Sequence, residues 1–567
     1  MKMKKGMSLF FGLFLVAILA LPVYAVTYYP QASCADQAST SAGCTKALLN
    51  AIGTTKKATI EYRHNTPGTT TTYTVAQNAD WSAYTNVTFK IASGAMISRG
   101  TFTVNIPNRN IGDVPFQWLT GSGAVTLSGN VSHVWADEFT VNVTPGTTNM
   151  TTAIQYAVNA LTKGTVKFLP KDHRITAAIT LHAYITLEGD NHSTSSVSVA
   201  PGYALNAFEW AAGGSTYGGL VIRYLTVTGN AVTPATGYGF YFLNIFNIVM
   251  EHCTVGYFKE GFHLEGGWGH FIKDAYAGNS TAYGFFFGGQ NSVLDTAQTD
   301  GGTIGLYLAA SFGSRIVNSI FEGATTASVK ITGDATGLSI IGNKLVKGIA
   351  AGTPDGIIDA NDANQYKMII SGNYIIVLGN GIKLTNTTAT SRTAIITSNH
   401  IIAISSGIEL ANYGENIVAN NWVSADVGIY IRTLDNTQGN LVSGNTIFGT
   451  TAAIKHDVAG SQTKYSNNYI YAGTTKYNLV SGTPYITHDN TASTLTLGAN
   501  VASTTISDTR VTANSVINLT PTSANAAADQ GSATGVWISA KSAGTSFTVT
   551  HPNNVNADKT YNYTIFN

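Results

Sequence analysis

The sequence is poor in charge and in proline. Charged residues make up 11% of the chain, and 31 Lys and Arg nearly cancel 30 Asp and Glu. No basic field therefore exists that could hold a nucleic-acid backbone, and we expect no nucleic-acid partner. Only 13 prolines occur, against many Gly, Thr, Asn, Val and Ile. This balance suits short strands joined by tight polar turns, so the composition favours an all-β protein.

Cysteine is scarce too, with three residues in 567. Cys34 and Cys44 lie close together in a polar N-terminal stretch, where an oxidising compartment would allow a disulfide. The sequence leaves open whether they are bridged. Cys253 falls within a periodic strand pattern, which favours a small buried hydrophobe over a nucleophile.

Long apolar runs are absent except at the N-terminus. Three lysines among the first five residues precede an apolar run over residues 9–21, and a small-residue cleavage site ends at Ala25. This pattern predicts a signal peptide over residues 1–25 and a secreted, cell-surface or periplasmic protein. An uncleaved membrane anchor is the alternative, although a span needs about 20 apolar residues. No later segment is apolar enough to span a membrane.

A short phrase, apolar-x-Gly-Asn-x-apolar, recurs from IIGNKL at residues 340–345 to YSNNYI at residues 465–470. Stacked copies would let the amide side chains bond along the stack and satisfy buried turn groups, each costing about 1 to 3 kcal/mol if unpaired. We predict a structural ladder of Asn318, Asn343, Asn373, Asn399, Asn421, Asn445 and Asn468. In the same frame the upstream positions are Leu225, Cys253, Asp274 and Asp295. The spacing gives one coil per 21 to 30 residues.

A second phrase, Gly-apolar-x-apolar, lies between copies of the first, so each coil holds at least two strands. Parallel stacking of coils about 4.8 Å apart would bury the alternate apolar residues. The pattern predicts a parallel β-helix over residues 146–480. A leucine-rich repeat is the competing solenoid, but these repeats use Ile, Val and Phe and show no helical period.

Residues 152–189, TAIQYAVNALTKGTVKFLPKDHRITAAITLHAYITLEG, resemble the opening segment of the pectate-lyase-like right-handed β-helix superfamily. The matching positions are Thr152, Ala153, Ile154, Gln155, Ala157, Gly164, Thr165, Val166, Phe168, Pro170, Ile175, Leu181, Leu187 and Gly189. Ile154, Ala157, Val158 and Leu161 have helical spacing and predict a short amphipathic capping helix. The Asp-rich turn and the Gly-x-Tyr of usual members are missing, and this scaffold hosts several activities, so the resemblance implies fold more than reaction.

The flanking blocks resemble other parts of such proteins. Residues 26–57 are a polar N-terminal segment, and residues 58–145 resemble the leading β-rich module of exported and tailspike-like members. Residues 481–567 resemble a small β-sandwich-like module of phage tail-fibre and β-helix proteins, with strands such as GVWISAK and SFTVTH. That resemblance implies a cap for the solenoid or a homotrimer.

If the second phrases stack, their outward residues form two rows. The first row is Tyr241, His263, Phe286, Tyr307, Lys330, Ile358, Lys383, Glu409, Tyr430 and Lys455. The second is Leu243, Glu265, Gly288, Ala309, Thr385, Ala411, Arg432 and Asp457. We expect plain cross-strand pairing of Lys383 with Glu409 and of Arg432 with Asp457.

The upstream part of these rows gives the candidate site. His263 and Glu265 share one strand face, and Tyr241, Trp268, Phe286 and Tyr307 could bind sugar rings. His270 lies in the following turn. Asp274 and Asp295 take the ladder position in successive coils, where stacked carboxyls would favour a protonated acid. The catalytic candidates are Glu265, Asp295, Asp274 and His263.

These residues suit a polysaccharide as partner. A glycoside hydrolase would use two of Glu265, Asp274, Asp295 and Glu322 as acid and base or nucleophile. A lyase would need a base, His263 or Lys273, and a cation or Ca²⁺ to neutralise a uronate. Asp355, Asp359 and Asp362 form an acidic cluster, for which loop solvation is favoured over calcium. The alternatives are a non-catalytic surface or fibre-like adhesin that binds glycans, and a structural spacer.

Overall fold

The computed structural model describes residues 25–566 except 66–68, 112–114, 130, 211–215, 231–236, 349–351, 361–366, 386–392, 433–438, 459–462, 473–474, 480–484, 489–492, 509 and 514. The predicted signal peptide thus lies outside the described residues apart from Ala25. Two compact units divide the chain: residues 1–144 with 148–169, and residues 145–147 with 170–567. The predicted domain boundaries remain predictions.

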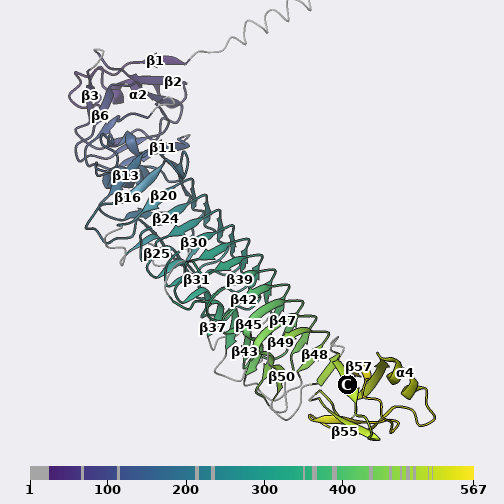
Figure 1. Cartoon of the computed structure of the whole chain (residues 1–567). Helices are drawn as coiled ribbons and strands as arrows, with labels where there is room; N and C mark the ends of the chain where they lie inside the picture. The colour runs from purple at the N-terminus through teal and green to yellow at the C-terminus, as the bar shows by residue number, and fades with distance from the viewer. Residues whose placement is uncertain are drawn as a thin grey trace, which may run out of the picture. The chain divides into compact units, whose positions relative to one another are not determined.

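The N-terminal unit is built from short parallel strands with alternating burial, as its sequence pattern predicts (Figure 1). One sheet runs β1 (Val26–Tyr28), β2 (Ala58–Tyr62), β5 (Val87–Ile91) and β8 (Arg109–Asn110). The others are β3 (Thr71–Thr74), β6 (Ala95–Ser98) and β9 (Leu119–Thr120), and β4 (Ala79–Asp80), β7 (Val104–Ile106) and β10 (Val125–Leu127). Later elements are β11 (His133–Trp135), η1 (Ala136–Glu138), α3 (Thr151–Ala160) and β12 (Gly164–Phe168). The expected amphipathic helix is α3, which buries Ile154, Ala157 and Val158.

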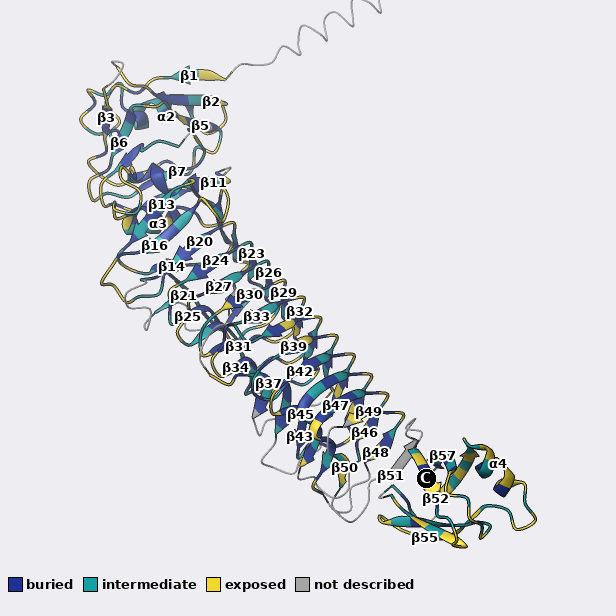
Figure 2. Ribbon diagram, in the orientation of Figure 1, coloured by how far each residue is buried: buried dark blue, intermediate teal, exposed yellow. Residues whose placement is uncertain are grey.

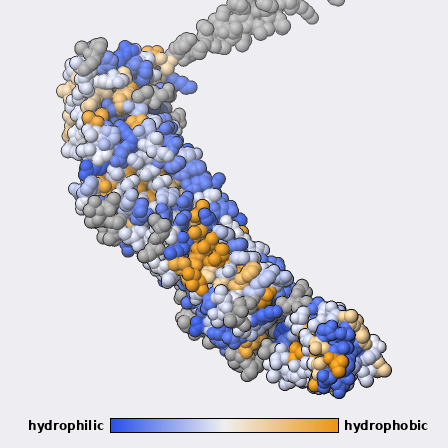
Figure 3. Space-filling view, viewed as in Figure 1, coloured by the Kyte–Doolittle hydropathy of each residue, from blue (hydrophilic) through white to orange (hydrophobic). Residues whose placement is uncertain are grey.

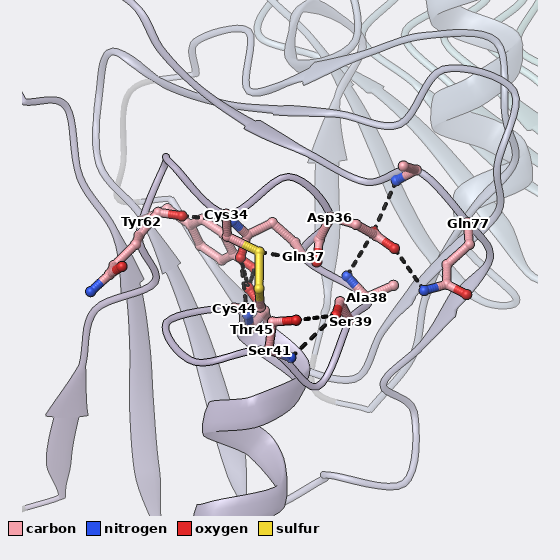
Figure 4. Close-up of a disulfide and its surroundings, with 12 residues drawn as sticks. Cys34, Asp36, Gln37, Ala38, Ser39, Ser41, Cys44, Thr45, Tyr62 and Gln77 are labelled. Atoms are coloured by element: carbon pink, nitrogen blue, oxygen red, sulfur yellow. Dashed lines mark hydrogen bonds between the residues drawn. A yellow bond between two sulfur atoms is a disulfide. The ribbon is translucent and has the colours of Figure 1, made fainter.

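A disulfide stabilises the polar N-terminal segment. Cys34 and Cys44 are joined, with their Cα atoms 5.5 Å apart, directly before α2 (Thr45–Ile52). Figure 4 shows the bridge beside the buried Thr45, whose backbone and hydroxyl both donate to Gln37 Oε1. The Thr45 hydroxyl also lies 2.7 Å from the Tyr62 hydroxyl. The bridge that the sequence left open is therefore present.

The second unit contains a parallel β-helix whose coils have three strands each, one more than the minimum predicted. We call the three columns of strands ladders A, B and C. Ladder A is β15 (Ile185–Gly189), β19 (Val221–Arg223), β23 (Val249–Glu251), β26 (Phe271–Lys273), β29 (Val293–Asp295), β32 (Arg315–Val317), β35 (Ser339–Ile341), β38 (Met368–Ser371), β41 (Ala394–Thr397), β44 (Ile417–Ala419), β46 (Leu441–Ser443), β48 (Lys464–Ser466) and β51 (Tyr485–His488).

Ladders B and C carry the other two faces. Ladder B is β13 (Asp172–Ile175), β16 (Ser196–Val199), β20 (Thr226–Thr228), β24 (Thr254–Gly256), β27 (Tyr276–Gly278), β30 (Gln298–Asp300), β33 (Ile320–Glu322), β36 (Lys344–Val346), β39 (Tyr374–Ile376), β42 (His400–Ile402), the first parts of β45 (Trp422–Arg432) and β47 (Thr446–His456), and β49 (Tyr469–Ala472). Ladder C is β14 (Ile179–Leu181), β17 (Phe208–Trp210), β21 (Tyr238–Leu243), β25 (Glu260–Glu265), β28 (Tyr283–Phe287), β31 (Ile304–Leu308), β34 (Ala327–Ile331), β37 (Asp355–Ala360), β40 (Ile382–Thr385), β43 (Ser406–Ala411), the last parts of β45 and β47, and β50 (Thr475–Leu479).

Alternate residues of these strands fill the interior of the helix with Ile, Val, Leu and Phe (Figure 2). Figure 3 shows hydrophobic side chains gathered on the surface around β39 and β42. The outward residues of ladder B there include the half-buried Val346, Ile376 and Ile402. This part of ladder B is therefore apolar on its outer side as well.

The asparagine column is continuous from Asn343 to Asn468 between ladders A and B. Each Asn Oδ1 accepts from the backbone N–H and the Nδ2 of the preceding Asn, at 2.9 to 3.1 Å. The six amides are almost fully buried. Because the four inner amides pair on both sides and all six donate to a backbone carbonyl, the column satisfies the buried turn.

The prediction is wrong for Asn318. The backbone N–H of Ser319, not of Asn318, donates to Asn343 Oδ1. Asn318 has a positive φ of 52°, like Asn420 and Asn467 one residue before the ladder. Its side chain lies in the outer turn because a short amide tolerates the left-handed conformation. The same one-residue slip applies to Asp274 and Asp295, because strand pairing places Ala275 and Ala297 in the buried column beside Ser319. Leu225 and Cys253 lie in that column as predicted.

The C-terminal module has two antiparallel sheets, as the alternating strands predict. They are β52 (Ser493–Leu497), β57 (Lys559–Phe566) and β54 (Val516–Pro521), and β53 (Ser503–Ser507), β56 (Ser546–Thr550) and β55 (Trp537–Ser542). A short helix, α4 (Ala524–Gln530), accompanies them. Leu495, Phe547 and Tyr561 lie in their common hydrophobic core.

Candidate functional site

The outward row of ladder C has the register that the sequence predicts. Tyr241, His263, Phe286, Tyr307 and Lys330 are successive partners on β21, β25, β28, β31 and β34. The pairing continues in the order Ile358, Lys383, Glu409, Tyr430 and Lys455. Residues far apart in the chain therefore form one wall of the β-helix.

A line of three titratable side chains crosses this wall on β25. His263 Nδ1 lies 2.6 Å from Glu260 Oε2, and His263 Nε2 lies 3.3 Å from Glu265 Oε2. Glu260 and His263 are 3% and 6% exposed, whereas the side chain of Glu265 is 57% exposed. The imidazole of His263 thus contacts a buried carboxylate at Nδ1 and an exposed carboxylate at Nε2.

Local sequence explains why Glu260 and His263 meet. Gly261 separates them, and a Cβ at this position would lie 2.7 Å from Gly284 O and 3.0 Å from Ala277 Cβ. Only glycine fits where the coils approach so closely, and the glycine of the repeated phrase recurs for this reason. The flanking Glu260 and His263, three residues apart, then contact each other on the outer side of the strand.

Aromatic rings stack on both sides of His263. Its ring centroid lies 5.0 Å from that of Tyr241 and 4.2 Å from that of Phe286, and Phe286 in turn lies 5.1 Å from Tyr307. The faces of His263 and Phe286 are therefore covered by neighbouring rings. A sugar would contact the ring edges and the half-exposed tyrosines rather than an open aromatic face.

A second aromatic row, not predicted, flanks the first. Tyr238, Glu260 and Tyr283 are successive partners in ladder C. Tyr238 stacks on Tyr241 at 4.7 Å, and Tyr283 stacks on Tyr307 at the same distance. Burial raises the pKa of Tyr241 and of Tyr283, so both phenols remain hydrogen-bond donors at neutral pH.

Lys259 adds a positive charge beside this line. Its Nζ lies 3.8 Å from Glu260 Oε1 and 5.5 Å from the centre of the Tyr238 ring. The neighbouring Tyr238 raises the pKa of Lys259, against the smaller opposing effect of burial. The ammonium group therefore stays charged near the carboxylate that holds His263.

The structure does not bring Asp274 and Asp295 to this site. Asp295 ends β29 in ladder A, opposite Lys273, and accepts from Asn318 Nδ2 at 3.2 Å. Asp274 lies in the left-handed turn after β26, 3.6 Å from His252 Nδ1. The two carboxyls are not stacked partners, because the register runs one residue away from the predicted frame. Their assignment as catalytic partners of Glu265 is therefore wrong.

Three other candidates lie outside β25. Glu322 is in ladder B, where it pairs with Asp300 of the preceding coil. Trp268 is 39% exposed in the turn after β25, and its ring lies 5.4 Å from that of Phe246. His270 is buried, and burial lowers its pKa, so it is a neutral core residue.

No three His, Cys, Asp or Glu side chains gather as a metal site would need within the described part of the chain. Asp355 Oδ1 accepts from Asn380, and Asp359 accepts from the buried Tyr413 hydroxyl. Asp362 lies outside the described residues. Downstream, Lys383 and Glu409 are cross-strand partners, as expected from sequence. The ion pairs there join Glu409 to Arg432 at 3.1 Å and Lys455 to Asp457 at 3.2 Å.

Sequence reasoning missed Glu260, Lys259, Tyr238 and Tyr283. The usable signal was the residue directly before each glycine phrase, which is Tyr238, Glu260 and Tyr283 in three consecutive coils. In a regular strand, residues three apart point to opposite faces, so alternation places Glu260 and His263 on different faces. In the structure, residues three apart on either side of the glycine nevertheless contact each other.

Residues 213–360 match the family model of the right-handed β-helix region. The chain is a right-handed parallel β-helix protein. No curated protein is significantly similar to this β-helix protein in sequence. The solved structures compared with it below share 11 to 19% sequence identity with this chain.

Three of these structures come from different kinds of protein: an epimerase, a glucanase and a phage tailspike. The A-module of the mannuronan C-5 epimerase AlgE4 from Azotobacter vinelandii is 19% identical and covers 61% of this chain and 96% of its own, with a TM-score of 0.37. The catalytic unit of a GH87 α-1,3-glucanase from Streptomyces thermodiastaticus is 14% identical over 65% and 69%, with a TM-score of 0.45. A tailspike protein of E. coli bacteriophage HK620 is 11% identical over 75% and 90%, with a TM-score of 0.49.

Proposed function

We propose that this β-helix protein binds a polysaccharide along ladder C and cleaves it by acid–base chemistry at His263 and Glu265. The observation that carries the proposal is the line Glu260–His263–Glu265, with a buried carboxylate on one ring nitrogen and an exposed carboxylate by the other. A purely structural ion pair does not require a third, exposed carboxylate on the same imidazole.

Each member has a distinct role. Glu260 is buried and does not touch substrate, so it is a positioning residue that holds Nδ1 as a donor and aims Nε2 outward. Glu265 is exposed and can give a proton to, or take one from, a bound sugar. His263 Nε2 can exchange that proton with Glu265 across 3.3 Å.

Two reactions use this arrangement. In hydrolysis, Glu265 would protonate the leaving glycosidic oxygen, and a water molecule would supply the incoming oxygen. In elimination, His263 or Glu265 would remove a carbon-bound proton beside a uronate carboxyl, and the glycosidic bond would break to leave an unsaturated sugar. The buried Glu260 does not supply the second exposed carboxyl of a hydrolase, which favours a single acid–base pair.

The surrounding residues would hold the chain of sugars. Tyr241, Tyr283 and Tyr307 are half-buried and offer hydroxyls and ring edges within four consecutive coils. Lys330 continues the row on the next coil, with its Nζ 5.9 Å from the centre of the Tyr307 ring. A polysaccharide along the row would thus meet aromatic edges, donors and one cation.

The test is cleavage of a panel of purified neutral and acidic polysaccharides. New reducing ends without ultraviolet absorbance would indicate hydrolysis, and both together would indicate elimination. Glu265→Gln and His263→Gln should lower the rate about 10²- to 10⁴-fold with little change in affinity. Lys383→Gln, on the same row farther along, is the matched control and should keep the rate.

The Glu260→Gln variant tests whether Glu260 only positions the imidazole of His263 or takes part in the reaction itself. It should lower the rate less than His263→Gln and shift the pH profile of cleavage, because the charge that holds the imidazole is removed. If Glu265→Gln and His263→Gln both cleaved at the normal rate, the proposed acid–base pair would be wrong.

The near-complete burial of His263 favours a second candidate, a non-catalytic adhesin or fibre that only binds glycans. Retained binding on a glycan array without any cleavage would support it, and no glycan binding at all would leave a structural spacer. Export through residues 1–25 and assembly into a homotrimer are further proposals from sequence. N-terminal sequencing of exported protein and light scattering test them. Within the described residues, no helix is long and apolar enough to cross a membrane.

A further inference from the structure

A concave site lies entirely within the N-terminal unit. It has a volume of about 630 Å³, and its lining comes from residues of β2, β5, β8 and β11 and the turns beside them. Sites for small ligands commonly have volumes of about 300 to 1,000 Å³. None of its lining residues takes part in the acid–base site of ladder C.

The lining is neutral and rich in hydrogen-bonding groups. Eight of the fifteen lining residues are Thr, Asn or Ser. Thr59 of β2 and Thr88 of β5 are in register on one outer face, and Asn108 directly precedes β8. Ile111 and Val131 add a small apolar surface. Hydroxyls and amides beside a modest apolar area suit a ligand with many hydroxyl groups and a few C–H faces.

Two buried polar atoms of the lining lack a hydrogen-bond partner among the described residues, Asn86 Oδ1 and Arg109 Nε. Asn86 Nδ2 donates to Gly53 O and to Lys56 O, which fixes the amide with its oxygen left over. Arg109 uses Nη2 for Glu138 Oε1 at 3.2 Å. One atom is an acceptor and the other a donor, and a sugar hydroxyl can serve either.

Charge narrows the class of ligand. Lys57, Arg109 and His133 line the site, and no carboxylate is among the fifteen residues. Since Glu138 neutralises Arg109, the exposed Lys57 supplies the remaining fixed charge. A basic ligand would be repelled, whereas an acidic one would be attracted.

We propose that this groove is a second saccharide-binding site, which takes a short oligosaccharide and prefers an acidic one to a basic one. It would hold substrate or surface glycan without cleaving it, because the lining contains no acid–base pair. The site is independent of the proposed catalysis at His263 and Glu265.

The test uses the full chain and three hexasaccharide probes: oligogalacturonate as acidic, maltohexaose as neutral and a chitosan hexamer as basic. Calorimetry on His263→Gln protein avoids cleavage of the probes. We expect binding in the order acidic, neutral, basic. Thr88→Trp should fill the groove and weaken binding at least about tenfold. Thr72→Trp, an exposed threonine on β3, is the matched control and should leave affinity unchanged.

Lys57→Glu gives a second variant without risk to the fold, because Lys57 is exposed. It should weaken the acidic probe several-fold and change the neutral one little. Binding at ladder C would be the same in all variants, so this groove is measured by the part of the binding that Thr88→Trp removes. Binding that neither Thr88→Trp nor Lys57→Glu weakens at all, binding of the basic probe alone, or no binding of any probe would overturn the proposal. If His263→Gln abolishes cleavage but leaves this binding intact, the two sites are distinct.

Discussion

The buried turn between ladders A and B differs between the two halves of the β-helix. From Asn343 to Asn468 an unbroken row of amides bonds along the stack. Upstream the same column holds Cys253, Ala275, Ala297 and Ser319, where only Ser319 and Cys253 offer a side-chain hydrogen bond. The same fold is thus kept by two kinds of turn, one held by hydrogen bonds and one packed with small side chains.

This difference coincides with where the chemistry lies. The coils with small turn residues carry the line Glu260–His263–Glu265 on ladder C, and the coils with amides carry ion pairs and apolar residues. The downstream coils are therefore expected to depend more on their turn for stability than the upstream coils do.

The largest expected effect is loss of an amide in the middle of the row. Asn399→Ala removes an acceptor from Asn373 and a donor to Asn421 and to Ile370 O. Buried groups left unpaired cost about 1 to 3 kcal/mol each, so we expect a loss of about 3 kcal/mol or more. Urea denaturation followed by circular dichroism measures it.

Cys253→Ala is the upstream counterpart. Its thiol makes weak contacts at 3.4 Å with Ile222 O and Glu251 O, so we expect a loss of about 1 kcal/mol. If the two variants shifted the denaturation midpoint equally, the row of amides would carry no special share of the stability.

The next effect is a pH dependence that we expect to be larger in the downstream half. His456 is 1% exposed, with Nδ1 2.8 Å from the Tyr465 hydroxyl, and burial lowers its pKa to about 4. The unfolded chain, with a His pKa of about 6.5, binds the proton first, so stability is full above that pH. It falls as pH drops toward and through 4, by up to about 3 kcal/mol at about 1.4 kcal/mol per unit.

Denaturation midpoints from neutral pH down to about 4 test this. His456→Gln can still bond to Tyr465 but cannot titrate, so its stability should fall less over that range. His270→Gln in the upstream half provides the comparison, since burial also lowers the pKa of His270. An unchanged slope in His456→Gln would assign the acid sensitivity to other groups.

The repeat made most of this fold predictable. The phrase spacing gave the ladder C register at every position from Tyr241 to Lys455, because alternation and a fixed glycine leave one way to stack the strands. The amide frame failed at Asn318 for a physical reason. Asn suits both the left-handed turn position and the buried position that follows it. The sequence alone therefore does not distinguish these two adjacent positions at Asn318, where the buried position is taken by Ser319.

The candidate site was less predictable from sequence. His263 and Glu265 follow from alternation, but the contact of Glu260 with His263 joins residues three apart on one strand across the tightly packed Gly261, which the pattern does not encode. Asp274 and Asp295 were assigned to the site by the same slip in frame that misplaced Asn318. Pairs two residues apart on one strand were predictable from alternation, and contacts across coils were predictable only where the register was fixed.

The smallest expected effects are those of the ion pairs that link neighbouring coils in the two halves. Downstream, Arg432 Nη1 lies 3.1 Å from the buried Glu409; upstream, Arg223 Nη2 lies 2.7 Å from the partly exposed Glu188. Arg432→Gln leaves a buried carboxylate without its cation and should cost about 1 kcal/mol. Arg223→Gln should cost about 0.5 kcal/mol, and added salt should remove most of this loss because it screens the partly exposed pair. A larger loss for Arg223→Gln would mean that exposure does not rank these pairs, and the contrast between the halves would then rest on the asparagine column alone.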